Sequence, residues 1–290
     1  MTYTGWILLT ASLVGVSCGL VGVFLILRKQ AMMADAISHT VLLGIVIAYL
    51  VTKQVNGPAM LVGGILAGIL TTFLVQWLHS LDVQHDASMG IVFTTLFAIG
   101  VILIATTTGN AHLDIQHALM GEITFIPFHT ISLPIFGDVP TATALLAVVF
   151  IIVLLSIILF YKEWKITSFD PALAASLGLP VLFLHYLFMT LVSVTTVASF
   201  DAVGAIMVVA MLITPAASAY LWTDKLFIML ILSALFGVIS AIVGYYVAAW
   251  VDTSISGSMA FVTGIVFLIS FIFSPKHGII AKYIKPTGSN

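Results

Sequence analysis

Long apolar runs separated by short polar breaks dominate the chain from end to end. Each run is about 20 residues long, which is the length that a helix needs to cross the hydrocarbon of a bilayer. The strands of a membrane β-barrel would instead alternate apolar and polar residues. The pattern therefore predicts an all-α fold, a polytopic transmembrane helical bundle of eight or nine spans in a single domain, 1–290. The nine predicted spans are 5–27, 32–51, 58–78, 88–107, 140–160, 180–199, 203–222, 226–250 and 258–274.

Lys and Arg are distributed unevenly between the two sets of polar breaks. Positively charged loops of membrane proteins stay in the cytoplasm. If the break at Arg28 and Lys29 lies in the cytoplasm, Lys53 is the only Lys or Arg that falls on the outer side of the membrane. We therefore expect the N-terminus outside and the C-terminus in the cytoplasm. The cations that fall inside are Arg28, Lys29, Lys162, Lys165, Lys225, Lys276, Lys282 and Lys285.

Two connections are too long to be plain turns. The inner one, 161–179, contains a short-helix signature, because Asp170 suits an N-cap and Pro171 suits the first helical position. Gly178 then stops the run, so about two turns of helix should lie on the cytoplasmic side. The other connection, 108–139, is an outer segment that is rich in His and acidic residues, or a re-entrant segment.

Composition excludes a soluble protein. Hydrophobic residues make up 61% of the 290 residues and charged residues only 7%, whereas soluble domains carry about 25% charged residues. No G-x-x-x-x-G-K-[ST] motif occurs, so no P-loop binds ATP on this chain, and no H-E-x-x-H zinc-protease motif occurs. We therefore expect no catalytic residues and no permanently bound cofactor. The net charge of −2 gives no indication of a nucleic-acid partner.

The stretch "LRKQAMMADAISHTVLLGI" carries an unusual pair, Asp35 and His39, inside a predicted span. Residues four apart share one face of a helix. An ionisable residue at membrane depth costs about 2.5–3.5 kcal/mol and normally faces a cavity or a partner. Carboxylate oxygen and imidazole nitrogen together suit a divalent ion such as Mn²⁺, Fe²⁺ or Zn²⁺. A hydrogen bond that fixes helix packing is the equally open alternative.

One Asp and one His are too few ligands to hold an ion. A symmetric dimer that places this helix at its axis would supply four. The neighbours Ala34, Ala36 and Ser38 are small, and small residues let helices approach closely.

In two further polar clusters the spacing of the residues is less typical of a metal site. The outer cluster of His112, Asp114, His117 and Glu122 could receive an arriving cation or contact a delivery protein, but its spacing favours a solvated polar loop. The inner stretch "HSLDVQHD" offers His79, Asp82, His85 and Asp86, near an exit or in a plain hydrated turn.

Five motifs, in order, resemble the membrane subunits of metal-ion ABC importers, the family that carries manganese, zinc and sometimes iron. The opening stretch "LRKQAMMADAISHTVLLGI" is similar to the family signature of a basic pair followed by Asp, Ala, a hydrophobe, Ser and His. Two departures, Met120 for a frequent Phe and Ala34 for a frequent Gly, touch neither proposed ligand. The other matches are "DASMGIVFTTLFAIG", "HALMGEI", "SFDPALAASLGLP" and "VGAIMVVAMLITPAASAYL".

The resemblance implies a homodimeric permease in the bacterial cell membrane, with two ATP-binding cassette ATPase subunits and an extracytoplasmic metal-binding protein as partners. Asp35 and His39 become a transient metal site at the dimer axis. The segment around 169–178 becomes a coupling helix against the ATPase. Its expected contact residues are Phe169, Asp170, Pro171, Leu173, Leu177 and Gly178.

The transported ion is expected to be Mn²⁺ first and Zn²⁺ second, because the proposed ligands include no thiolate. A proton-coupled secondary metal transporter that uses the same Asp–His pair is the rival interpretation. An intramembrane hydrolase is a second rival, but no complete catalytic set can be assembled from the sequence.

Overall fold

The computed structural model describes residues 2–53, 57–107, 123–128, 130–133, 137–276 and 278–279. Within these residues, nine helices are long and apolar enough to cross a membrane, which confirms the predicted bundle. They are α1 (Tyr3–Leu27), α2 (Ala31–Thr52), α3 (Gly57–His79), α4 (His85–Thr107), α6 (Thr141–Leu159), α9 (Val181–Val203), α10 (Ala205–Trp222), α11 (Leu226–Val251) and α12 (Ile255–Phe273).

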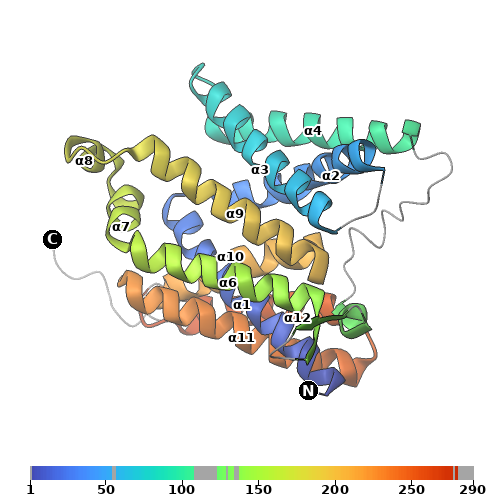
Figure 1. The fold of residues 1–290 in the computed structure, drawn as a ribbon. Coiled ribbons are helices and arrows are strands. Elements are labelled where there is room, and N and C mark those ends of the chain that lie inside the picture. Colours follow the sequence, from blue (N-terminus) through green and yellow to red (C-terminus); the bar gives the residue numbers. More distant parts are fainter. Residues whose placement is uncertain are drawn as a thin grey trace.

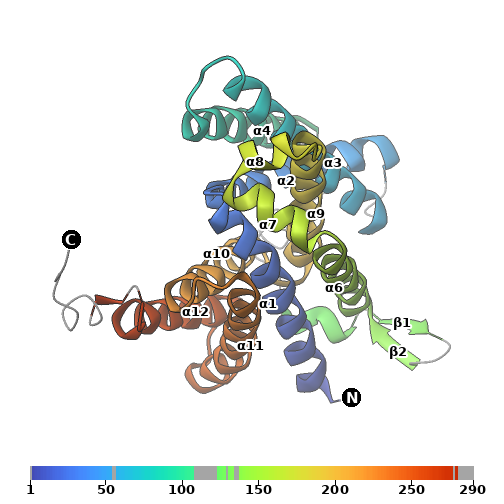
Figure 2. The same cartoon turned by 90° about the vertical axis from the view of Figure 1, so that its left-hand side faces the viewer.

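The helices form two groups with α9 between them. Figure 1 shows α2, α3 and α4 together on one side, and α1, α6, α11 and α12 on the other. In the view of Figure 2, α1 lies between α6 and α11. Helix α1 packs on α6, α9, α10 and α11, and its residues Val14, Val21 and Phe24 are fully buried. It is therefore the central helix of the larger group.

Glycines allow the closest helix contacts. A Cβ on Gly15 of α1 would collide with the backbone of Gly237 in α11, and a Cβ on Gly237 would collide with Gly15. The same reciprocal relationship joins Gly44 of α2 to Gly63 of α3. Small residues at such positions let helix backbones approach closely, which is a main source of packing energy between membrane helices.

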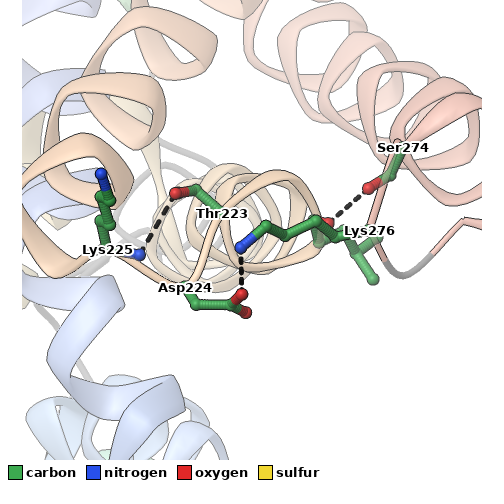
Figure 3. Close-up of polar contacts among 6 residues, drawn as sticks. Thr223, Asp224, Lys225, Ser274 and Lys276 are labelled. Atoms are coloured by element: carbon green, nitrogen blue, oxygen red, sulfur yellow. Dashed lines mark hydrogen bonds and ion pairs between the residues drawn. The ribbon is translucent and has the colours of Figure 1, made fainter.

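The basic breaks lie at one end of the bundle, and α1 begins at the opposite end (Figure 1). At the basic end, Lys276 forms an ion pair with Asp224, and Ser274 Oγ donates to the carbonyl of Leu221 (Figure 3). The break between α10 and α11 is thereby tied to the end of α12. By the distribution of positive charge we infer that this end faces the cytoplasm.

Short elements complete the described chain. The 3₁₀ helix η1 (Ile123–Phe128) and the antiparallel strands β1 (Thr130–Leu133) and β2 (Gly137–Pro140) are the described parts of the segment 108–139. Each is too short to cross a bilayer. The Tyr3 hydroxyl donates to the carbonyl of Thr124 at 2.6 Å, which ties η1 to the start of α1.

The inner connection holds two helices rather than one. The expected helix is α8 (Pro171–Ser176), and a second, α7 (Tyr161–Phe169), precedes it. At the opposite end of α9, the single residue Gly204 separates α9 from α10. Its φ of 82° and ψ of 162° belong to a region that is essentially restricted to glycine.

Candidate functional site

The break before α2 is a defined backbone motif. Lys29 has a left-handed φ of 57°. Its amide donates to the carbonyl of Ile26, and the amide of Gln30 donates to that of Leu25, both at 2.9 Å. These two bonds form a Schellman motif, which satisfies carbonyls at the end of α1. Because α2 begins directly afterwards at Ala31, Asp35 lies only about one turn inside this helix.

Asp35 and His39 lie on one face of α2, as their spacing predicts. His39 Nε2 is 3.5 Å from Asp35 Oδ1, and the two side chains are 40% and 36% exposed, respectively. Two ligand atoms at about 2.1 Å from one tetrahedral ion are about 3.4 Å apart. The pair can therefore grip a single ion with little rearrangement, while its exposure leaves further coordination positions open.

Two aromatic rings of α4 hold the imidazole. The ring of His39 stacks on Phe93, with centroids 5.6 Å apart and planes 27° apart. Phe97, one turn later, meets it edge-on at 5.5 Å. Such pairs restrict the orientation of a ring beyond what burial alone does. Sequence reasoning missed these two residues, although their spacing of four matches that of Asp35 and His39.

The small neighbours of the pair pack inside the chain's own bundle. Ala34, Ala36 and Ser38 are buried within the chain's own bundle, so they serve the packing of α2 against its neighbours rather than the surface that carries the pair. Ser38 Oγ also donates to the carbonyl of Asp35 at 2.7 Å. Their small size lets α2 pack closely on its neighbours, as the sequence indicates.

Within the described part of the chain, no group of three or more His, Cys, Asp or Glu side chains could hold a metal ion. Asp35 and His39 could therefore supply two ligands, and no other described residue of the same chain completes a set of three. The outer candidates His112, Asp114, His117 and Glu122 lie outside the described residues. Their role in receiving metal stays a prediction.

The inner histidines line a basic cavity of about 750 Å³. His79 and His85 lie edge to face, with ring centroids 5.4 Å apart, and His79 Nδ1 lies 3.0 Å from the carbonyl of Val83. Arg28 and Lys29 also line the cavity, and no Asp or Glu does. This charge distribution disfavours a bound cation, so the cavity is less suited to metal than the Asp35–His39 face.

Arg28 ties the first break to the inner connection. Its Nε donates to Ser168 Oγ and a terminal nitrogen donates to Thr167 Oγ1, each at 3.1 Å. The guanidinium carbon also lies 4.4 Å from the centre of the Phe188 ring. Burial lowers the pKa of Arg28 to about 10, which still leaves it charged at neutral pH. Helix α7 is thus bonded to the residue that caps α1.

Trp164 anchors α7 in the bundle. It is fully buried, and its ring centroid lies 5.5 Å from Phe24 of α1 and 5.7 Å from Phe188 of α9. Sequence reasoning missed α7, although Tyr161, Trp164 and Ser168 recur at the spacing of one helix face. A displacement of α7 would therefore act directly on two spans.

Helix α8 has the predicted termini. Asp170 Oδ1 accepts from the amide of Leu173 at 2.9 Å, which is the expected N-cap bond. Gly178, with φ of 79°, follows the end of the helix. Phe169, Leu173 and Leu177 are 57%, 49% and 61% exposed, and such a patch of apolar side chains beyond the spans is typical of a protein contact.

Comparisons with known proteins agree with these motifs. The chain matches the model of the ABC 3 transport family over residues 1–274. It is 55% identical over 287 residues to the manganese transport system membrane protein MntD of Bacillus subtilis (strain 168), covering 98% of this chain and 97% of that protein. It is 41% identical to the zinc transport system membrane protein TroD of Treponema pallidum (strain Nichols), covering 95% and 75%, respectively.

A solved structure shares the fold. PsaBC from Streptococcus pneumoniae in complex with Fab matches with a TM-score of 0.80 and 33% identity, over 96% of this chain and 94% of that chain. The predictions of a multi-pass bacterial membrane protein, and of a transport subunit rather than an enzyme, are confirmed by these relatives and by the nine spans. With its family model matched over nearly its whole length, the chain belongs to the ABC 3 transport family.

Proposed function

We propose that this chain is the permease subunit of an ATP-driven importer that carries a divalent transition metal into the cell, with manganese as the first candidate and zinc as the second. The relatives MntD and TroD are named for manganese and zinc transport, respectively. The observation that carries the proposal is the Asp35–His39 pair, 3.5 Å apart on an accessible face of α2. Oxygen and nitrogen ligands without thiolate suit either metal.

Two copies of the pair, one from each protomer of a homodimer, would replace part of the hydration shell of the ion. The side chains are more than one-third exposed in a single chain, which fits ligands that are completed by a second copy. A closed four-ligand cage would bind too tightly for transport. The open geometry allows the ion to be released when the helices that carry Asp35 and His39 move apart.

The energy for this movement would come from two ATPase subunits on the cytoplasmic side. The exposed apolar residues Phe169, Leu173 and Leu177 form the surface on which we place the ATPase. Trp164 and Arg28 connect that surface to α1 and α9. An extracytoplasmic metal-binding protein would deliver the ion at the other end.

Metal accumulation in cells tests the site. We expect Asp35→Asn and His39→Gln each to lower the initial rate of manganese uptake at least about tenfold, the usual effect of disturbing a metal site. Met32→Leu, on the same helix and 58% exposed, is the matched control and should transport normally. Wild-type uptake by both site variants at equal membrane expression would remove the assignment.

Reconstitution separates the proposed function from a proton-coupled transporter. In liposomes that contain the chain and its ATPase partner, we expect metal transport to require ATP hydrolysis. Liposomes that contain the chain alone should show no uptake when a proton gradient is applied. Uptake that is driven by the gradient without the ATPase would replace the proposal by the secondary-transport mechanism.

A further inference from the structure

We propose that a groove between α6 and α11 binds one phospholipid of the inner leaflet through a headgroup that carries a primary ammonium beside a phosphate. The groove has a volume of about 880 Å³. Helix α1 forms its floor through Leu20, which is 8% exposed. Figure 2 shows helix α1 between α6 and α11.

The walls of the groove suit an acyl chain. Ile158 of α6 and Phe227 and Ile231 of α11 line it, and these side chains are 64%, 64% and 53% exposed, respectively. All three lie on helices long and apolar enough to cross the membrane, so the hydrocarbon of the bilayer is what surrounds them. The occupant of the apolar part is therefore a lipid tail.

Polar groups gather at one end of the groove only. Helix α6 ends at Leu159 and α7 begins at Tyr161, so Lys162 and Glu163 line the groove where it leaves the apolar span. This is also the basic, cytoplasmic end of the bundle. The depth of these two residues corresponds to the headgroup region of the inner leaflet.

Glu163 supplies the specific feature of the site. Its Oε2 is buried and has no hydrogen-bond partner among the described residues. Adjacent residues on a helix do not face each other, so Lys162 is not positioned as its counter-ion. Among the described residues, no ion pair involves Glu163, so its carboxylate at the polar end of the groove can accept charge-assisted hydrogen bonds from an ammonium group.

The two charges together select the headgroup. A primary ammonium can donate to Glu163 while the phosphate, two carbons away, accepts from Lys162. A glycerol headgroup offers no cation to the carboxylate. A choline headgroup offers a cation without any N–H donor, so it loses the charge-assisted hydrogen bond.

Native mass spectrometry of the purified full-length chain tests the proposal. Delipidated protein in detergent is titrated with phosphatidylethanolamine, phosphatidylcholine or phosphatidylglycerol of identical acyl chains. We expect one phosphatidylethanolamine to bind at least about tenfold more tightly than either other lipid, the advantage of hydrogen bonding to a charged group. Equal retention of the three lipids by the wild-type protein would overturn the proposal without any variant.

Three variants locate the site. Glu163→Gln keeps the shape of the side chain and should reduce the headgroup preference to less than about twofold, because the charge-assisted bond is lost. Lys165→Gln, on α7 but outside this groove, is the matched control and should keep the preference. Ile231→Trp fills the apolar part of the groove and should weaken the binding of all three lipids. A preference that survives Glu163→Gln would place the lipid elsewhere and refute the assignment.

Discussion

The imidazole of His39 stacks on the ring of Phe93, with centroids 5.6 Å apart. This contact joins His39 of α2, one of the two proposed ligands, to helix α4. The geometry of the site is therefore set by two helices, although both proposed ligands of one chain come from a single helix.

Phe93→Ala should lower metal transport without removing a ligand. Loss of an aromatic pair costs about 1 kcal/mol, so we expect about a fivefold lower uptake rate at metal concentrations below saturation. Phe93→Tyr keeps the stacked ring and should transport nearly as the wild type does. Wild-type uptake by Phe93→Ala would show that the ring does not position His39.

Trp164→Ala should strongly destabilise the protein. Removing a fully buried indole leaves a large cavity, which costs about 3–5 kcal/mol in the free energy of unfolding. Trp164→Phe should cost less, because Nε1 has no hydrogen-bond partner among the described residues. Thermal unfolding in detergent measures both effects.

Trp250 provides the matched control for this prediction. It lies in α11 and is 88% exposed, so Trp250→Ala should change the unfolding temperature little. Equal effects at the two positions would contradict the anchoring role of Trp164.

Asp170→Ala should loosen α8 without disturbing the spans. The Asp170 carboxylate accepts the amide hydrogen of Leu173, and loss of an N-cap costs about 1 kcal/mol. Hydrogen exchange at the amides of α8 should become faster, and the ratio of metal transported to ATP hydrolysed should fall. Asp170→Ser retains a capping oxygen and should restore both; unchanged exchange in the alanine variant would argue against the cap.

Gly44→Ala should force α2 and α3 apart. The new Cβ would meet the carbonyl of Gly63, and overpacking of this kind costs about 1–3 kcal/mol. Because α2 carries Asp35 and His39, metal uptake should fall together with the unfolding temperature. Gly264→Ala in α12 meets nothing within 4 Å and should leave both unchanged, so equal losses in the two variants would rule out the packing explanation.

The parts of the fold that depend on local physics could be predicted from the sequence. Hydropathy defined the nine spans to within a few residues, because a bilayer demands long apolar helices. The cap at Asp170 and the stop at Gly178 followed from turn chemistry. The shared face of Asp35 and His39 followed from helix periodicity.

Features that depend on contacts between distant segments could not be predicted in this way. The stacking of Phe93 on His39 requires the packing of α2 on α4. Nothing local in the sequence indicated that Ala34, Ala36 and Ser38 face the chain's own bundle. Helix α7 was overlooked because its apolar face rests on Trp164, whose partners Phe24 and Phe188 lie on two other spans.

The one-residue junction at Gly204 has a mechanical consequence. With no loop between them, α9 and α10 meet in a one-residue elbow, and its neighbours Ala202, Val203 and Ala205 are buried. Both helices pack on α2, and the inner end of α9 lies against α7 and α8. A push that begins at the end of α9 beside α7 and α8 would therefore turn at this elbow and reach α2, the helix of Asp35 and His39, from two directions.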